Sequence, residues 1–467
     1  TDYLSRHPSP MRSPTRPMVV LTTLFFMWGF MTVMNDVLVP HLKAVFTLSY
    51  AQSLLVQFSF FGAYFLGSLG YYAVSRSSGD PIARVGYKRA VVAGLVVSAV
   101  GSVLFVPATY LHLYGMYLLA LFVLGLGFTL LQIAANPFVA IVGPPEGASS
   151  RLNLAQAFNS LGTTLAPLIG GALLFDLFRG DAAVRWPYAA FAGLLLLQAL
   201  WVVLTPLPEP SSDGGAGTAT TAWRHRPLRW GMLAIFCYVG AEVAVGSLII
   251  NLLKLESVLG LSEADGKNYL GLYWGGAMVG RFLGAVALQD RMSVTRRQLL
   301  LPALAVLLFG LLWGINRLSG ALALDHLWPM GVLILANMVV FMLAGRRPGQ
   351  VLGFFAAAAA ALCLAVMATG GAWTLWAVVA IGLFNSIQWS NIFTLAIDGL
   401  GPATGQGSSL LVMMIVGGAL VPPLQGLMID LFQGGDDADV GFHLSFVLPA
   451  LCYGFLIWYG FRGSQRA

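Results

Sequence analysis

The stretch LTTLFFMWGFMTVMNDVLVPHLKAVF (residues 21–46) poses a question whose answer decides the fold. It is apolar over at least the length of a membrane-spanning helix, yet it contains the polar pair Asn35 and Asp36. A charged side chain near the centre of a bilayer costs at least about 2.5–3.5 kcal/mol on insertion scales. A sequence keeps such a residue only where another interaction or a function offsets that cost.

The whole chain has the composition of an integral membrane protein. Of its 467 residues, 58% are hydrophobic and only 9% are charged, whereas a soluble protein carries about 25% charged residues. The expected solvent is therefore the lipid bilayer. The net charge of +6 is small for this length and indicates positive cytoplasmic loops rather than a nucleic-acid-binding surface. The three cysteines lie in apolar runs and show neither a disulfide framework nor metal-ligand spacing.

Hydropathy predicts fourteen membrane-spanning helices, since each span needs about 20 mostly apolar residues. The alternating segments of roughly ten residues that build a membrane β-barrel are not seen. The first run is too long for a signal peptide and no small-residue cleavage site follows it, so we expect it to remain as an anchor. The predicted spans are 18–39, 53–75, 87–107, 114–142, 153–176, 186–205, 230–252, 267–288, 298–315, 328–345, 350–369, 373–397, 408–430 and 442–461.

Lysine and arginine residues in the short loops predict the orientation of the chain. With fourteen spans, the cationic segments 76–89, 224–229, 291–297 and 346–347 fall on the same side as both tails, so both termini are predicted to be cytoplasmic. The opposite loops hold fewer cations, scattered among acids. If either span within 298–345 were absent, the later cationic segments would change sides.

A polar, glycine- and serine-rich segment at 206–229 follows six spans and is predicted to be a flexible cytoplasmic linker. It separates one half at 18–205 from another at 230–461, with tails at 1–17 and 462–467. LLQIAANPFVAIVGPPEGASSRLNLAQAF (130–158) is weakly repeated as NSIQWSNIFTLAIDGLGPATGQGSSLLVMMI (385–415). Fused halves of this kind are typical of transporters that bind substrate near the membrane mid-plane. If each half has six spans, the pair within 298–345 is an insertion that preserves orientation.

Two carboxylates are predicted to lie within spans. Asp36 lies toward the outer end of the first span, and Glu242 lies near the middle of the seventh. A buried acid with access to water can exchange a proton near neutral pH, as a proton-coupled carrier requires. The alternatives are an interfacial Asp36 paired with His41 or Lys43, and a structural Glu242 bonded to neighbouring helices.

Neutral amides form polar faces on four spans. Spacings of three or four residues place such side chains on one helix face, and amides both donate to and accept from sugar hydroxyls. Interhelical hydrogen bonding is the alternative, but four such faces favour a shared polar cavity. The predicted sugar-binding residues, including two tryptophans that offer stacking surfaces, are Asn35, Gln132, Asn136, Gln156, Asn159, Asn251, Trp274, Asn385, Gln388, Trp389 and Asn391.

Charged residues near the cytoplasmic ends of spans are candidates for a gate that holds one conformation closed. Simple orientation charges would have the same sequence pattern. These candidates are Arg84, Lys88, Glu146, Arg151 and Arg281. The sequence contains no catalytic constellation and no Walker-type phosphate loop. We therefore expect no enzyme activity, no cofactor, no metal ion and no use of ATP.

Five segments carry a family resemblance: FFMWGFMTVMNDVLVPHLKAVFTLSYAQSLLVQFSFFGAYF, LLQIAANPFVAIVGPPEGASSRLNLAQAFNSLGTTLAPLIGG, YVGAEVAVGS, YWGGAMVGRFLG and GLFNSIQWSNIFTLAIDGLG. They resemble the bacterial fucose/galactose/glucose:proton symporter family of the major facilitator superfamily, and the glucose/galactose porters most. The resemblance covers the chain except its linker, tails and insertion. It implies an all-α fold of two six-helix halves in the bacterial inner membrane, which acts as a monomer by alternating access around a central sugar site.

The resemblance also implies functional residues. The fucose symporter uses one acid in its first span, matched here by Asp36, and one in its fourth, which is Gln132 here. Since Gln132 cannot titrate, the two-acid scheme does not transfer intact. Glu242 lies where the fucose symporter has an amide and is the expected replacement. This departure leaves sodium coupling and plain facilitation open.

The sequence therefore predicts a proton-coupled symporter for a hexose such as glucose or galactose, with a sugar, a proton and the bilayer as its partners. A sodium-coupled symporter or a facilitative uniporter is the alternative within transport. A sugar sensor that binds without translocating would carry a soluble output domain, for which this sequence has no candidate. An intramembrane enzyme would need a nucleophile–base or metal motif.

Overall fold

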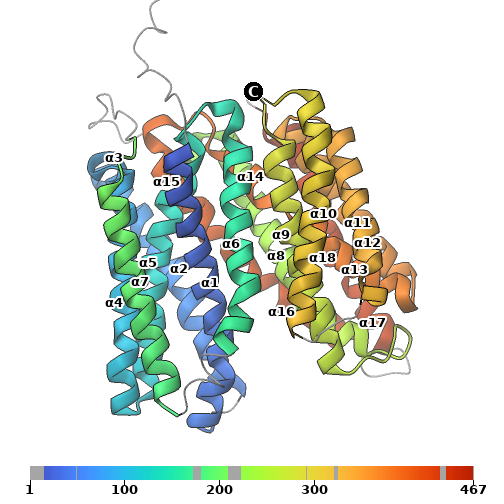
Figure 1. Cartoon of the computed structure of the whole chain (residues 1–467), viewed down its shortest axis with the longest axis horizontal. Coiled ribbons are helices and arrows are strands. Elements are labelled where there is room, and N and C mark those ends of the chain that lie inside the picture. The colour runs from blue at the N-terminus through green and yellow to red at the C-terminus, as the bar shows by residue number, and fades with distance from the viewer. Residues whose placement is uncertain are drawn as a thin grey trace, which may run out of the picture.

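Long, roughly parallel helices form a two-part bundle in the computed structural model of the chain (Figure 1). It describes residues 15–48, 50–171, 180–208, 222–290, 292–319, 324–431 and 438–465, and no strand occurs among them. The helices are α1 Thr15–Val45, α2 Tyr50–Ser78, α3 Pro81–Val85, α4 Tyr87–Leu111, α5 Tyr114–Ile141, α6 Ala148–Gly171, α7 Ala182–Leu204, α8 Arg226–Lys254, α9 Glu263–Ala287, α10 Val294–Ser319, α11 Leu324–Ala344, α12 Pro348–Ala368, α13 Gly371–Asn385, α14 Gln388–Ile397, α15 Thr404–Met413, α16 Gly417–Asp430, α17 Ala438–Ser445 and α18 Val447–Trp458.

Eleven helical segments of the described chain are long and apolar enough to cross a bilayer. Three further long helices, α2, α6 and α9, are not among them and are richer in polar residues. With 29, 24 and 25 residues and a rise of about 1.5 Å per residue, they still exceed a hydrocarbon core of roughly 30 Å. The all-α membrane architecture is thus confirmed, while the count of fourteen spans stays a prediction.

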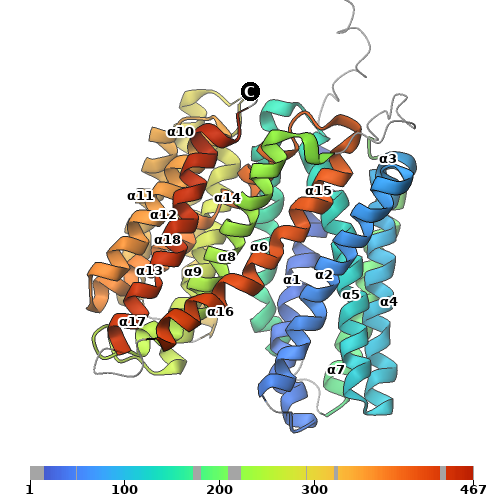
Figure 2. The same cartoon turned by 180° about the vertical axis from the view of Figure 1, so that it is seen from behind.

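The two ends of the bundle differ in charge. We call the end that holds residues 222–225 and the C-terminus the linker end, and the opposite one the far end (Figures 1 and 2). Because successive long helices reverse direction, the cationic segments 84–89, 224–229, 296–297 and 346–347 all lie at the linker end. This distribution supports the predicted cytoplasmic termini, which we retain as a proposal.

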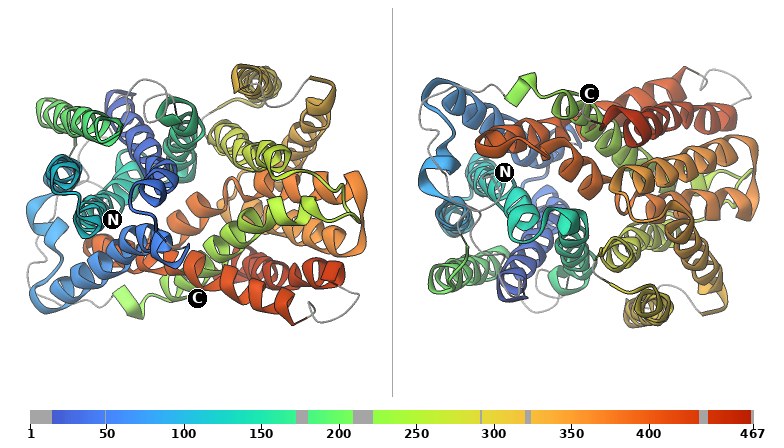
Figure 3. Two further views of the ribbon diagram at one scale, coloured as in Figure 1. Left: turned by 90° about the horizontal axis from the view of Figure 1, so that it is seen from below. Right: turned by 90° about the horizontal axis from the view of Figure 1, so that it is seen from above.

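The two halves repeat one packing pattern. In the first half α4 packs against α5 and α7, and in the second half α12 packs in the same way against α13 and α18. The sequence repeat has a structural counterpart: a 3₁₀ turn at Pro145–Gly147 joins α5 to α6, and one at Gly401–Ala403 joins α14 to α15. The helices α10 and α11 have no counterpart in the first half and lie at the edge of the second (Figure 3). This arrangement supports the proposal that they are an inserted pair.

The halves meet through equivalent helices. In the first half α6 packs against α9 and α14, while α15 of the second half packs against α2 and α5. Within the first half, small residues let α6 approach α1 to backbone contact. A Cβ atom on Gly162 would lie 2.3 Å from the carbonyl oxygen of Phe26. These close contacts fix α6, whose other face carries much of the candidate site.

Candidate functional site

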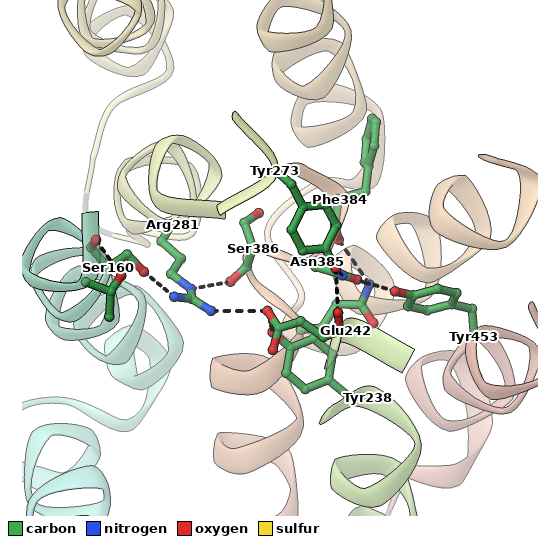
Figure 4. Close-up of polar contacts among 11 residues, drawn as sticks. Ser160, Tyr238, Glu242, Tyr273, Arg281, Phe384, Asn385, Ser386 and Tyr453 are labelled. Atoms are coloured by element: carbon green, nitrogen blue, oxygen red, sulfur yellow. Dashed lines mark hydrogen bonds and ion pairs between the residues drawn. The ribbon is translucent and has the colours of Figure 1, made fainter. Parts of the chain in front are cut away.

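Glu242 is the centre of a buried polar cluster in the second half (Figure 4). It lies in the middle of α8, and its side chain is 11% exposed. The Tyr238 hydroxyl, one turn earlier on α8, donates to Oε1 of Glu242 at 2.7 Å. The Arg281 guanidinium of α9 places Nη2 3.6 Å from the same oxygen. The carboxylate therefore faces the interior of the bundle, where a cation and a hydroxyl stabilise it.

Arg281 connects this cluster to the other half. Its Nε donates to the backbone carbonyl of Ser386 at 3.1 Å, and its Nη1 donates to the Ser160 hydroxyl on α6. The sequence placed Arg281 among the gate candidates. The structure pairs it with Glu242, at the junction of the halves, and its gate role stays a prediction.

Both polar atoms of the Asn385 side chain form hydrogen bonds with tyrosine hydroxyls. Its Nδ2 donates to the Tyr273 hydroxyl at 2.9 Å, and the Tyr453 hydroxyl donates to its Oδ1 at 2.7 Å. Tyr273 in turn donates to the backbone carbonyl of Glu242 at 2.8 Å. In this conformation Asn385 joins α8, α9, α13 and α18 rather than offering groups to a ligand.

Four buried polar groups at the helix break after Asn385 have no hydrogen-bond partner among the described residues. The break at 386–387 separates α13 from α14, and broken membrane helices are typical of transporter binding sites. In the described part of the chain these groups are the Oε1 of Gln388, the Nε1 of Trp389 and the hydroxyls of Ser386 and Ser390. Buried polar groups without a partner are unfavourable, so these groups are candidates for contact with a polar ligand.

Three predicted amides lie together in the first half. Asn136 of α5 donates through Nδ2 to the backbone carbonyl of Gln132, one turn earlier, at 3.1 Å, and Gln156 of α6 donates to Oδ1 of Asn136 at 3.3 Å. Asn159 is separate, because its Nδ2 donates to the carbonyl of Phe25 on α1 at 3.0 Å. Gln132, Asn136 and Gln156 therefore form one polar group, whereas Asn159 joins two helices.

The remaining predicted sugar-binding residues lie outside these groups. Asn251 is exposed near the far end of α8. Trp274 is 38% exposed and packs over Gly246, where an added Cβ would lie 3.2 Å from the indole ring. The side chains of Asn35 and Asp36 lie outside the described part of the structure, so the proton-coupling role of Asp36 stays a prediction.

A seam of neutral hydrogen bonds joins the halves toward the linker end. The hydroxyls of Ser149 and Thr394 are 2.7 Å apart, and Nδ2 of Asn153 donates to Oδ1 of Asn391 at 3.3 Å. Ser150 donates to the carbonyl of Ala285 at 2.6 Å. Asn391, predicted to bind sugar, thus lies in this seam.

Asp80 adds a charged contact to the linker end that the sequence did not single out. Its Oδ1 caps α3 by accepting from the backbone N–H of Ile82 at 3.0 Å, and it also accepts from the Tyr71 hydroxyl. Its Oδ2 accepts from the backbone N–H of Gln406, in the first turn of α15, at 2.8 Å. A carboxylate is favourable at the positive end of a helix dipole, so Asp80 stabilises the contact between the halves.

The other gate candidates act within the first half. Lys88 Nζ donates to the carbonyls of Val203 and Thr205, both at 2.9 Å, at the end of α7. Arg151 donates through Nε to the carbonyl of Val139 at 3.0 Å, at the end of α5. Such contacts satisfy helix C-termini. Arg84 lies in α3 and Glu146 in the 3₁₀ turn before α6.

Comparison with known proteins identifies relatives of the whole chain. The family model of the Major Facilitator Superfamily matches residues 19–345. A glucose/galactose transporter of Brucella abortus is 41% identical over 455 residues, covering 95% of this chain and 93% of that protein. The L-fucose-proton symporter of Escherichia coli is 30% identical and covers 98% and 95%. A crystal structure of the E. coli fucose:proton symporter matches with a TM-score of 0.74 at 28% identity, covering 98% of this chain and 100% of that chain.

Proposed function

The chain belongs to the Major Facilitator Superfamily, and from that premise we propose that it is a sugar transporter of the bacterial inner membrane. More specifically, we propose proton-coupled uptake of a hexose such as glucose or galactose by alternating access. Its relatives are transporters rather than enzymes, and among them are a glucose/galactose transporter and L-fucose-proton symporters.

The observation that carries this proposal is the burial of Glu242 where the two halves meet. An acid at this depth is retained only for a strong reason, and here its carboxylate is bonded by Tyr238 and paired with Arg281. A site that exchanges a proton and contacts both halves is what coupling requires.

Neutral groups near this acid supply the proposed sugar site. Gln388 and Trp389 offer an unpaired acceptor and donor, and the indole ring of Trp389 offers an apolar face for a pyranose ring. Gln132, Asn136 and Gln156 are the amides of the facing half. Such groups recognise hydroxyls without requiring charge on the substrate.

The hydrogen-bonded seam toward the linker end indicates which state of the transport cycle this conformation represents. If the linker is cytoplasmic, as we propose, the hydrogen bonds of Ser149, Ser150 and Asn153 close the cytoplasmic side. Sugar and proton then enter from the far end, and separation of this seam releases them inside.

Purified protein in liposomes tests the proposal. We expect an inwardly directed proton gradient, acidic outside, to drive accumulation of one labelled hexose inside the liposomes, and a proton ionophore to abolish it. Accumulation under a sodium gradient without a pH gradient would establish the sodium-coupled alternative, and equilibration without accumulation would establish a uniporter. Binding of the hexose without any flux would instead indicate a sensor.

A further inference from the structure

We propose that Arg281 is the positioning residue that converts protonation of Glu242 into separation of the two halves at the linker end. The inference rests on the proposed proton-coupled function and adds a residue that does not itself carry the proton. It follows from the contacts of one guanidinium with both halves.

Arg281 bridges the acid and the facing helix. Its Nη2 lies 3.6 Å from Oε1 of Glu242, while its Nη1 donates to Ser160 of α6. Glu242, with its partners Tyr238 and Tyr273, belongs to the second half, and Ser160 belongs to the first. Within the described chain, this arginine–serine contact joins the Glu242 cluster to the first half.

The α6 helix presents a stripe of small polar side chains to the second half. Ser149, Asn153, Ser160 and Thr164 are spaced by four, seven and four residues and so share one helix face. Ser149 contacts α14 at 2.7 Å, and Asn153 contacts it at 3.3 Å. Thr164 lies 3.9 Å from the sulfur of Met278 on α9. The Arg281–Ser160 contact is therefore part of the seam that separates when the halves move.

Protonation of Glu242 would leave Arg281 without a counter-ion. The side chains of Arg281 and Glu242 are only 13% and 11% exposed, and a guanidinium stays charged under all relevant conditions. The titratable groups that face Glu242 are Tyr238 of α8, Arg281 and Tyr273 of α9, and Tyr453 of α18. Arg281 is the cation among them.

An uncompensated buried cation is strongly unfavourable. Once Glu242 accepts a proton from water, the guanidinium retains only neutral acceptors, the Ser386 carbonyl and the Ser160 hydroxyl. Separation of the seam lets water reach the guanidinium and relieves this penalty. Loss of the proton to the newly exposed side restores the ion pair and favours closure again. Proton binding is thereby linked to opening of the linker end.

A disulfide crosslink across the seam measures this linkage directly. In a chain with Cys237, Cys363 and Cys452 replaced by alanine, Ser149→Cys with Thr394→Cys places two thiols where hydroxyls lie 2.7 Å apart. The pair Thr369→Cys with Thr374→Cys, whose native hydroxyls lie 3.0 Å apart within the second half, corrects for the effect of pH on thiol chemistry. We expect the seam-to-control crosslinking ratio in membrane vesicles to fall several-fold from alkaline to acidic buffer.

Charge substitutions separate Arg281 from a general effect of pH. Glu242→Gln should give a low ratio at every pH, because Arg281 is then always unpaired. Glu242→Gln combined with Arg281→Gln should give a high ratio at every pH, because the cluster around residue 242 then holds neither the acid nor the cation. Arg317→Gln, the same change at the far end of α10, should behave as the parent chain does.

A parent ratio that does not change with pH would overturn the proposal, as would a double variant whose ratio stays as low as that of Glu242→Gln. Crosslinking requires no sugar, so sugar counterflow in the same vesicles tests the proposed function separately. If the vesicles show sugar counterflow but the crosslinking ratio does not change with pH, Arg281 does not have the proposed role. If the crosslinking ratios are as expected but no hexose shows counterflow, the role of Arg281 is retained and the proposed substrate is wrong.

Discussion

At the scale of single residues, the site is a set of polar groups whose partners decide their roles. Asn385 and Gln388 lie one helical turn apart and have the same chemistry, yet Asn385 is bonded to Tyr273 and Tyr453 while Oε1 of Gln388 has no partner. The sequence identified both amides but could not separate them, because their partners lie on other helices. Tyr238 could have been found from the sequence, since it precedes Glu242 by four residues on the same helix.

Replacement of Gln388 tests the proposed sugar site. In Gln388→Leu the sugar loses a hydrogen-bonding partner worth roughly 1–3 kcal/mol in a buried site, so KM for counterflow should rise about 5- to 150-fold. Asn251→Leu, at the exposed amide of α8, is the matched control and should leave KM unchanged. Equal KM values for all three proteins would exclude Gln388 from the sugar site.

Replacement of Asp36 tests the second predicted proton site. Asp36→Asn retains size and hydrogen bonding but cannot titrate, so uphill accumulation should be lost while counterflow exchange persists. Accumulation and counterflow of labelled hexose in proteoliposomes give the two readouts. Full uphill uptake by this variant would leave Glu242 as the coupling acid.

At the scale of elements, contacts at helix ends hold the halves together at the linker end, and one helix pair lies at the edge of the second half. Asp80 serves both halves at once, because Oδ1 caps α3 and Oδ2 accepts from the first turn of α15. Ala222, which precedes α8, also contacts the first turn of α15, since the side chain of Gln406 accepts from the backbone N–H of Ala222 at 2.7 Å. Local sequence predicts the cap of α3, but the contact with α15 arises only from the packing of the halves.

Removal of the Asp80 carboxylate should favour opening at the linker end. Asp80→Ala removes a capping interaction worth about 0.5–2 kcal/mol from α3 and another from α15. Maleimide labelling of Ser149→Cys, in the cysteine-free chain, should therefore become several-fold faster. Asp181→Ala is the control, because Asp181 pairs with His112 at the far end. Equal labelling rates in all three backgrounds would show that Asp80 does not hold the seam.

Excision of α10 and α11 tests whether this pair is an insertion outside the transport core. The ends of the pair are adjacent, since Arg346 donates through Nη1 to the carbonyl of Asp290 at 2.9 Å. Replacement of 292–345 by a short glycine–serine bridge should preserve membrane insertion and sugar counterflow, because an even number of spans is removed. Loss of α12 alone, which packs on α13 and α18, should abolish both. An excised chain that inserts but shows no counterflow would place the pair within the transport core.

At the scale of the whole molecule, two repeated halves meet along α6 and α15. Equivalent helix contacts on each side support a two-fold arrangement, in which one pivoting motion closes one end as it opens the other. The clustering of cations at the linker end supports the proposal that this end is cytoplasmic. Together these features support the proposal that the proton and sugar sites lie between the halves.

Topology mapping tests this assignment. Single cysteines at Arg224 and Arg347, at the linker end, should react with a membrane-impermeant maleimide only after cells are permeabilised. A cysteine at Leu113, which precedes α5 at the far end, should react in intact cells. Reaction of Arg347→Cys in intact cells would show that the chain crosses the membrane an odd number of times between residues 224 and 347.

The sequence by itself determined the solvent, the helical class, the repeat of 130–158 at 385–415 and the buried acid Glu242. These features are local: apolar length, loop charge and residue spacing are read along the chain, and a lone carboxylate in an apolar run is visible without a structure. Only the tertiary structure decided that Arg281 pairs with Glu242 and reaches Ser160, 121 residues away in the chain. It also decided that Asn391 belongs to the seam and that Lys88 and Arg151 bond to helix ends of their own half. The physical reason is that each of these partners is supplied by the packing of another helix, which the periodicity of one helix does not encode.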